Sequence, residues 1–181
     1  MTPVIFTKKV DEFTFEFKLL SGGFVGVILV TPNGKIVCQK ETNKDYFRFP
    51  GGGIDQEDGD LFEANSQEDF LGIARKTAVR EVKEECGLSI DISRLRFLGF
   101  SMTEDEKDRE GGKSYMRTFF SYKFLPEEKI LGNQWSSEEN GERIEYQFRQ
   151  IPVEKKRANL EGIRLSSLHF AALIAFLRAP Q

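Results

Sequence analysis

Three glutamates in one short stretch could together do chemistry. Residues 80–88 read Arg-Glu-Val-Lys-Glu-Glu-Cys-Gly-Leu, which puts Glu81, Glu84 and Glu85 at positions i, i+3 and i+4. On a helix these carboxylates would share one patch of surface, where like charges repel and weaken the helix. A hard divalent cation such as Mg²⁺ would offset that repulsion, because it binds through carboxylate and carbonyl oxygens. A solvated Glu-rich helix face would have the same residues, so the cluster alone leaves both interpretations open.

The residues around the cluster favour the metal-binding interpretation. A Phe-Pro-Gly-Gly-Gly turn at 49–53 precedes the segment, and Gly-Leu at 87–88 is a C-terminal stop signal for a helix. Glu81 and Glu85 fall at the edge of the apolar row of this helix, where a carboxylate is costly without a partner. That row has the spacing i, i+4, i+8 and consists of Ala74, Ala78 and Val82.

These residues resemble the Nudix box of the Nudix hydrolase family, Gly-x5-Glu-x7-Arg-Glu-U-x-Glu-Glu-x-Gly-U, where U is aliphatic. Gly52 matches the opening Gly, and the resemblance extends over about residues 22–178. Every fixed position in the second half of the box is matched, by Arg80, Glu81, Val82, Glu84, Glu85, Gly87 and Leu88.

The first half of the box departs from the family pattern. Between Gly52 and Arg80 lie 27 residues, whereas the family pattern has about 13. The position of the first box Glu, counted back from Arg80, is Gly72; counted forward from Gly52 it is Asp58, with Glu68 as a weaker candidate. We interpret residues 56–72 as an acidic insertion, a loop leading into an N-terminally extended helix. In the family this Glu is mostly structural, so its displacement affects geometry more than chemistry.

The resemblance implies hydrolysis of a diphosphate linkage by a water molecule, with Mg²⁺ or Mn²⁺ as cofactor. The implied metal ligands are the carbonyl of Gly51 and the side chains of Glu81, Glu84 and Glu85. Glu81 is also the candidate base. Arg80 would orient a box carboxylate by ion pairing or, as the less favoured role, contact a phosphate.

Further candidates lie outside the helix. Glu142 is the favoured additional catalytic carboxylate, although each acidic residue of this kind also suits an ordinary loop position. Phe47 and Arg48, with Gly52 and Gly53, are candidate substrate-binding residues. The alternatives are strand packing for Phe47 and solvent exposure for Arg48. The other carboxylates considered beside Glu142 are Glu138, Glu139 and Glu104.

Composition limits the other function classes. The chain has 181 residues and a net charge of −3, so a nucleic-acid partner is not expected. Its single histidine, His169, excludes a His-based zinc site. Its two cysteines, Cys38 and Cys86, are too few for a disulfide framework and suit small core positions. No apolar run is long enough for a membrane span, so a cytoplasmic location is the default expectation.

Periodicity predicts one mixed α/β domain over residues 1–181. Phenylalanines alternate with polar residues at 13–17, a continuous apolar run at 24–30 suits a buried strand, and Pro-Asn-Gly-Lys at 32–35 predicts a hairpin turn. This order of elements agrees with the Nudix-like helix–sheet–helix sandwich with a mixed β-sheet. Predicted strands cover 10–20, 24–30, 36–40, 95–102, 115–124 and 144–148, predicted helices cover 74–86 and 165–177, and 126–143 is a predicted polar loop.

Residues 1–21 lie outside the minimal fold as an extra N-terminal strand segment. In Nudix branches that act on ADP-ribose or nucleotide sugars, such a strand often serves dimerisation. We therefore expect either a homodimer formed through this strand or an edge strand added to the sheet of the same monomer.

The favoured substrate is a nucleoside diphosphate linked to a sugar, of the nucleotide sugar or ADP-ribose type. Sanitising hydrolysis of (d)NTPs ranks second. Coenzyme A ranks third: the run at 49–58 looks like coenzyme A pyrophosphatases, but Gln-Lys-Glu at 39–41 replaces their basic, His-containing motif. RNA 5′-end pyrophosphate removal is less favoured by the acidic charge. A non-catalytic Nudix-fold binding module is the alternative from another class, and such modules typically lose the box glutamates.

Overall fold

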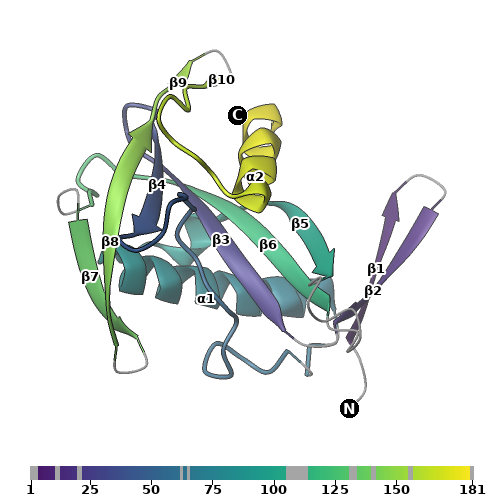
Figure 1. Cartoon of the computed structure of the whole chain (residues 1–181). Helices are drawn as coiled ribbons and strands as arrows, with labels where there is room; N and C mark the ends of the chain where they lie inside the picture. The colour runs from purple at the N-terminus through teal and green to yellow at the C-terminus, as the bar shows by residue number, and fades with distance from the viewer. Residues whose placement is uncertain are drawn as a thin grey trace.

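A six-stranded mixed sheet forms the centre of the molecule, in the order β5-β6-β3-β4-β8-β7 (Figure 1). The computed structural model describes residues 4–10, 13–19, 22–61, 63–64, 66–104, 114–130, 134–139, 142–154 and 157–179. β3 and β6 are parallel, and the other neighbours are antiparallel. The strands are β3 (Gly23–Val30), β4 (Ile36–Glu41), β5 (Arg96–Glu104), β6 (Ser114–Lys123), β7 (Gln134–Glu139) and β8 (Glu142–Ile151).

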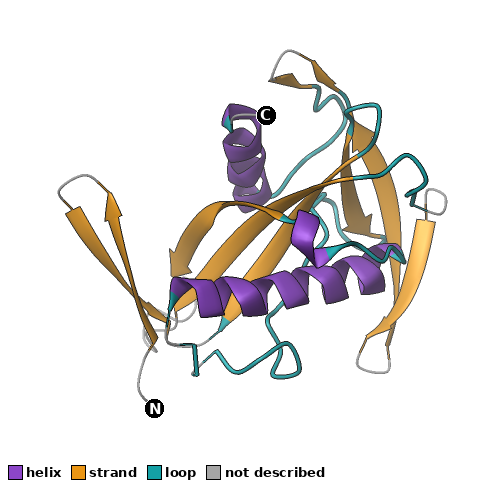
Figure 2. Cartoon of the chain, turned by 180° about the vertical axis from the view of Figure 1, so that it is seen from behind, coloured by secondary structure: helices purple, strands orange, loops and turns teal. Residues whose placement is uncertain are grey.

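Two helices cover the sheet from opposite sides, as Figures 1 and 2 show together. α1 (Gln67–Cys86) packs on one face and α2 (Ser167–Arg178) on the other. Successive strand residues point to opposite faces, so Val27 of β3 packs beneath α1 while Ile28 packs beneath α2. This arrangement explains the continuous apolar run of β3 and confirms the predicted sandwich with a mixed sheet. The remaining elements are the 3₁₀ turn η1 (Ile92–Arg94) and the short hairpin of β9 (Val153–Glu154) and β10 (Arg157–Ala158).

α1 carries the second half of the box, and a local residue caps the helix at each end. Ser66 caps the N-terminus, where its side chain accepts a hydrogen bond of 3.1 Å from the Asp69 N–H. At the other end Gly87 has φ 66°, a left-handed conformation that favours glycine, and its N–H donates to the Lys83 carbonyl. The helix begins seven residues before the predicted Ala74, so the last part of segment 56–72 is helical.

The predicted polar loop at 126–143 was wrong, because β7 lies within it. β7 is the edge strand of the sheet and pairs only with β8 among the described strands. An edge strand has solvent on one side and therefore tolerates polar residues, and the sequence Gln-Trp-Ser-Ser-Glu-Glu shows no strong alternation. β8 is longer than predicted for the same reason, since its first residues pair with β7.

The N-terminal segment was predicted as one strand, and the structure shows a hairpin instead. β1 (Val4–Val10) pairs with β2 (Phe13–Leu19) in register from Val4↔Leu19 to Val10↔Phe13. Within the described residues this hairpin is a separate two-stranded sheet, which contradicts the edge-strand alternative (Figure 1). The polar Thr-Lys-Lys run at 7–9 concealed β1 from periodicity. In the described part of the chain, no helix is long and apolar enough to cross a membrane.

Candidate active site

The carboxylates of α1 lie beneath the glycine-rich turn at residues 50–53. β3 holds this turn through its backbone: Val25 N–H donates to Gly52 O at 2.9 Å, and Val27 N–H donates to Pro50 O at 2.8 Å. A Cβ at Gly52 would collide with the Glu81 carboxylate, so glycine at this position lets the turn and Glu81 lie in their observed places. The turn and the helix therefore form one unit, although they are far apart in the sequence.

Glu85 is the most enclosed of the three carboxylates, with 1% of the residue exposed. Its Oε2 accepts a hydrogen bond of 2.6 Å from Gln39 Nε2 and another of 2.6 Å from the Gly51 N–H. Its Oε1 accepts from Arg48 Nη2, and the two side chains form an ion pair. Such charge-assisted bonds are the kind that a buried carboxylate requires.

Arg48 bridges Glu85 and the glycine turn. Its Nη1 donates to the Gly51 carbonyl at 3.3 Å, and its Nη2 lies 3.6 Å from Glu41 Oε1. The guanidinium also lies 5.9 Å from the centre of the Tyr146 ring. Burial by itself would lower the pKa of Arg48, but the Glu85 carboxylate, with smaller contributions from other groups, raises it above its usual value. Arg48 Nε is buried and has no hydrogen-bond partner among the described residues.

Glu81 is also buried, with 7% of the residue exposed. Desolvation and the negative charge of Glu85, with a smaller contribution from Glu84, raise its pKa to about 8, and Arg80 opposes this shift only in part. A carboxyl group with such a pKa marks excess negative potential, which a bound cation would relieve.

Arg80 is held by acidic groups and a carbonyl. Its Nη2 donates to Asp58 Oδ2 and to Gly53 O, each at 2.9 Å, and its Nε donates to Asp58 Oδ1 at 3.1 Å. Its Nη1 donates to Glu81 at 2.9 Å and to Glu84 at 3.0 Å. Arg80 thus joins the glycine turn, the following loop and the box carboxylates.

Asp58, which holds the position of the first box Glu when counted forward from Gly52, contacts Arg80. It is 5% exposed and also accepts a hydrogen bond of 3.0 Å from Thr77 Oγ1. Burial favours its neutral form, but the hydrogen bonds, led by those from Arg80, outweigh this and keep the pKa of Asp58 below its usual value. Glu68, the other candidate, has an exposed side chain and pairs with Arg75. The inserted residues therefore come after Asp58 and leave its contact with Arg80 intact.

The structure brings most of the predicted residues together, but Phe47 lies elsewhere. Phe47 packs in the core cluster beneath α2, whereas its neighbour Arg48 points to the α1 side. The strand-packing alternative for Phe47 therefore describes its position, and the solvent-exposed alternative for Arg48 does not. Glu142 begins β8 and pairs in register with Glu139 of β7; its side chain lies outside the described residues. The predicted residues gathered at the site are Arg48, Gly51, Gly52, Gly53, Arg80, Glu81, Glu84 and Glu85.

Sequence reasoning missed three residues that hold the site. Gln39 is fully buried and bonds Glu85; the signal was a polar side chain at the end of the apolar run Ile-Val-Cys at 36–38. Thr77 supports Asp58 from α1. Trp135 of β7 donates from Nε1 to the Glu84 carbonyl at 2.7 Å. Trp135 could not be found, because β7 itself was not predicted.

His169 and the cysteines have packing positions. His169 is buried on the α2 side, where its Nδ1 accepts a hydrogen bond of 3.1 Å from the Phe49 N–H. Burial, with Arg48 and Arg117, lowers the pKa of His169 to about 3, so the ring is neutral. Cys38 and Cys86 are buried free thiols, and burial raises the pKa of Cys38 to about 12.

The donor set suits a hard divalent cation. It consists of carboxylate oxygens and the Gly51 carbonyl, and the Arg48 guanidinium already binds two of these groups as a cation would. Within the described residues, no three acidic, His or Cys side chains converge on one metal position. Arg48 and Arg80 bind the carboxylates instead, so the residues fit a metal by their chemistry and would have to exchange partners to bind it.

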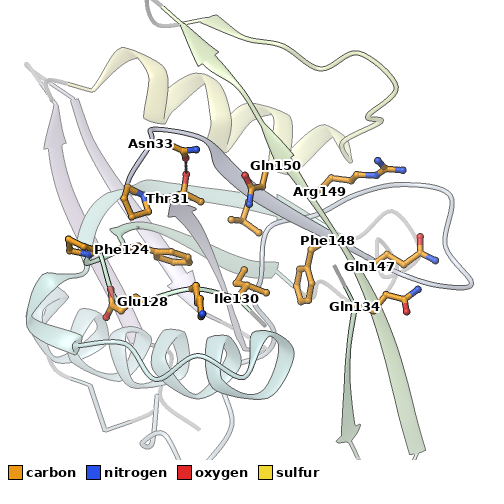
Figure 3. A pocket seen from close by; sticks show the side chains of 14 residues that line it. Thr31, Asn33, Phe124, Glu128, Ile130, Gln134, Gln147, Phe148, Arg149 and Gln150 are labelled. Atoms are coloured by element: carbon orange, nitrogen blue, oxygen red, sulfur yellow. Dashed lines mark hydrogen bonds between the residues drawn. The ribbon is translucent and has the colours of Figure 1, made fainter. Parts of the chain in front are cut away.

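A large cavity in the described part of the chain is separate from this cluster (Figure 3). Its volume is about 1340 Å³, and it is lined by the β3–β4 turn, the segment after β6, and strands β7 and β8. Side chains such as Phe124, Phe148 and Gln134 point into it, and no box residue lines it. We place the chemistry at the carboxylates, because the cavity has no comparable set of ligands.

Comparison with known proteins agrees with this geometry. The family model of the NUDIX domain matches residues 22–163. No curated protein matches the sequence. A MutT NUDIX hydrolase from Burkholderia pseudomallei has a similar fold, with a TM-score of 0.51 and 16% identity over 84% of this chain and 95% of that chain.

Two further solved structures share the fold at low sequence identity. The mMutator MutT protein from Bacillus halodurans has a TM-score of 0.53 and 14% identity, over 88% of this chain and 84% of that chain. The NUDIX domain of Shewanella oneidensis NrtR, solved with ADP ribose, has a TM-score of 0.52 and 12% identity, over 87% of this chain and 86% of that chain. With the family model covering most of the chain and the box carboxylates gathered on α1, the chain belongs to the NUDIX domain family and is a pyrophosphohydrolase of that family.

Proposed function

We propose that this protein hydrolyses the diphosphate linkage of a nucleoside diphosphate joined to another group, with a nucleotide sugar or ADP-ribose as the favoured type. The observation that carries the proposal is the cluster of buried Glu81 and Glu85 with partly exposed Glu84 on α1, held against the glycine turn, where the Gly51 N–H binds Glu85. The ADP-ribose complex of the NrtR domain and the N-terminal segment outside the family match support the preference for this substrate type.

The chain supplies three functions at the site. Glu81 is the proposed base that takes the proton of the attacking water. Without metal its pKa is raised to about 8, and a bound cation would favour the ionised form that can accept a proton. Arg80 positions Glu81 and Glu84 through its ion pairs. Bound Mg²⁺ or Mn²⁺ would neutralise charge on the phosphoryl oxygens. Its proposed ligands are the Gly51 carbonyl and the side chains of Glu81, Glu84 and Glu85.

Two assignments complete the proposal. Gly52 and Gly53 let the backbone come close to the substrate, because neither has a side chain in the way. Glu142 is the proposed carboxylate from outside the box; it begins β8, whose later residues 146–151 pair with β4.

The test is turnover of a substrate panel. Purified protein is incubated with Mg²⁺ or Mn²⁺ and ADP-ribose, nucleotide sugars, dinucleoside polyphosphates, coenzyme A or (d)NTPs, and products are identified by mass. We expect metal-dependent release of a nucleoside monophosphate and a phosphorylated remainder from the favoured class. Faster turnover of (d)NTPs would replace the favoured substrate with the second candidate.

Glu85→Gln is the matched control for this assay. We expect it to keep the fold, judged by circular dichroism, and to lose about 10²-fold or more of turnover, as when one group that stabilises the transition state is removed. No turnover of any compound by the parent, with unchanged ligand binding by Glu85→Gln, would favour a non-catalytic binding module.

A further inference from the structure

Arg48 lies on the oxygens that the proposed function assigns to the metal. Its Nη1 binds the Gly51 carbonyl at 3.3 Å and its Nη2 binds Glu85 Oε1. A divalent ion bound to both oxygens would take up acceptor positions that the guanidinium now uses. Two cations at that distance repel each other strongly in a site shielded from water. Arg48 and the metal therefore compete for the same ligands.

Glu85 can lose Arg48 without losing its other partners. The hydrogen bonds from Gln39 Nε2 and the Gly51 N–H go to Oε2, whereas Arg48 binds Oε1. The oxygen that Arg48 would release is thus the one that these two donors leave available. A metal ligand needs such an arrangement, with one oxygen fixed by neighbours and the other directed at the ion.

Two groups next to Arg48 could hold its guanidinium after it leaves Glu85. Glu41 Oε1 lies 3.6 Å from its Nη2, and the Tyr146 ring lies beneath the guanidinium at 5.9 Å. Both can hold a guanidinium that has left Glu85. Its buried Nε has no hydrogen-bond partner, so its present position leaves one donor unsatisfied.

We propose that Arg48 is an internal counter-ion that occupies the metal position in the metal-free protein and is displaced when the divalent ion binds. The inference rests on the proposed function, which makes the Gly51 carbonyl and Glu85 metal ligands. Arg48 is then a positioning residue. In the absence of metal it neutralises buried Glu85, and the free energy needed to displace Arg48 weakens metal binding.

The experiment measures Mn²⁺ binding to the metal-free full chain without substrate, by the loss of the electron paramagnetic resonance signal of free Mn²⁺. We expect Arg48→Met to bind Mn²⁺ about tenfold more tightly than the parent, a coupling of ordinary size. Arg164→Met is the charge-matched control, since Arg164 pairs with Asp45 on the surface; its affinity should stay within about twofold because exposed charges are screened.

Arg48→Lys separates occupancy of the site from simple charge. Lysine keeps the positive charge but lacks the guanidinium, whose two Nη groups reach the Gly51 carbonyl and Glu85 Oε1 at the same time. We expect an affinity between those of the parent and Arg48→Met, whereas an effect of charge alone would leave it at the parent value. In EDTA, Arg48→Met should melt at a lower temperature than the parent, and saturating Mn²⁺ should narrow that difference.

Two results would overturn the inference, and they can be told apart. If the parent binds Mn²⁺ and turns over substrate while Arg48→Met binds Mn²⁺ no more tightly, Arg48 does not hold the metal position and the proposed function stands. If no variant binds Mn²⁺ and the parent is inactive, the inference and the proposed function both fail.

Discussion

Arg80 and Arg48 approach the carboxylates of α1 from two sides, and each pairs with a buried acid. Arg80 uses Nε, Nη1 and Nη2. It binds the proposed metal ligands Glu81 and Glu84, but it also binds Asp58 and the Gly53 carbonyl, which are not proposed ligands. Arg48 uses Nη1 and Nη2, leaves Nε without a partner, and binds two groups that are proposed metal ligands. The same guanidinium chemistry thus gives a fixed structural connection at Arg80 and an exchangeable one at Arg48.

The difference follows from the acids they bind. Asp58 comes from the loop before the insertion and accepts hydrogen bonds from Arg80 on both of its oxygens, at 3.1 Å on Oδ1 and 2.9 Å on Oδ2. The Thr77 hydroxyl and the Asp55 N–H also donate to Oδ2. Glu85 likewise has neutral donors, in Gln39 and the Gly51 N–H, but Arg48 binds it through Oε1 alone. Replacing Arg48 at Glu85 therefore breaks fewer charge-assisted hydrogen bonds than replacing Arg80 at Asp58.

The largest expected effect comes from removing Arg80. Arg80→Met leaves buried Asp58 without its cation, and we expect a loss of about 3 to 5 kcal/mol in the free energy of unfolding. The measurement is urea unfolding. Arg75→Met on the same helix is the control, because Arg75 pairs with exposed Glu68 and should cost at most about 0.5 kcal/mol. Equal losses of unfolding free energy in the two variants would mean that Arg80 stabilises the fold no more than an arginine in a surface ion pair.

A second effect tests the neutral donors of Glu85. Gln39→Met keeps the volume and removes the bond to Glu85, and we expect a loss of about 1.5 to 3 kcal/mol in stability, as for a bond to a charged group. Arg48→Met should then cost more in the Gln39→Met background than in the parent, by more than about 0.5 kcal/mol. Additive losses in this double-mutant cycle would show that Gln39 does not make Arg48 dispensable.

The pH dependence of metal-free stability tests Glu81, which lies beside Arg80. Its folded pKa of about 8 exceeds its usual value of 4.5, so between these values the folded state holds a proton that the unfolded state has released. Stability must therefore fall as pH rises through this window. His169, with a folded pKa of about 3, gives the opposite slope, but only below its usual value of 6.5.

Between pH 6.5 and 8, therefore, Glu81 changes the stability with pH and His169 does not. In EDTA the parent should lose up to about 1.4 kcal/mol per pH unit there, measured by urea unfolding at several pH values. Glu81→Gln should flatten the slope. An unchanged slope in Glu81→Gln would mean that Arg80 keeps Glu81 ionised after all.

The smallest expected effect is at Glu41, the half-exposed partner of Arg48. Its ion pair of 3.6 Å is of the surface kind, so Glu41→Gln should change stability by no more than about 0.5 kcal/mol. If Glu41 receives the displaced Arg48, the variant should also bind Mn²⁺ more weakly than the parent. A large loss of stability would instead make Glu41 a principal partner of Arg48 in the metal-free state.

Prediction from sequence succeeded where the signal was local. The helix that carries Glu81 and Glu85, the stop at Gly87 and the hairpin turn at 32–35 depend on neighbouring residues, and all are present. The family, the fold class and the enzyme class were confirmed. β1 and β7 were missed because polar residues interrupt any alternation in them, at 7–9 in β1 and over most of β7, and their pairing partners decide their conformation.

The sequence by itself determined which groups could bind a metal and that they would share one helix face. Only the tertiary structure decided which partner each group has. Asp58 meets Arg80 across the insertion, and Arg48 meets Glu85 from the segment after β4, because chain segments far apart are brought together by the fold and not by spacing. Side-chain pairing over such separations depends on packing in three dimensions, which periodicity along the chain does not encode.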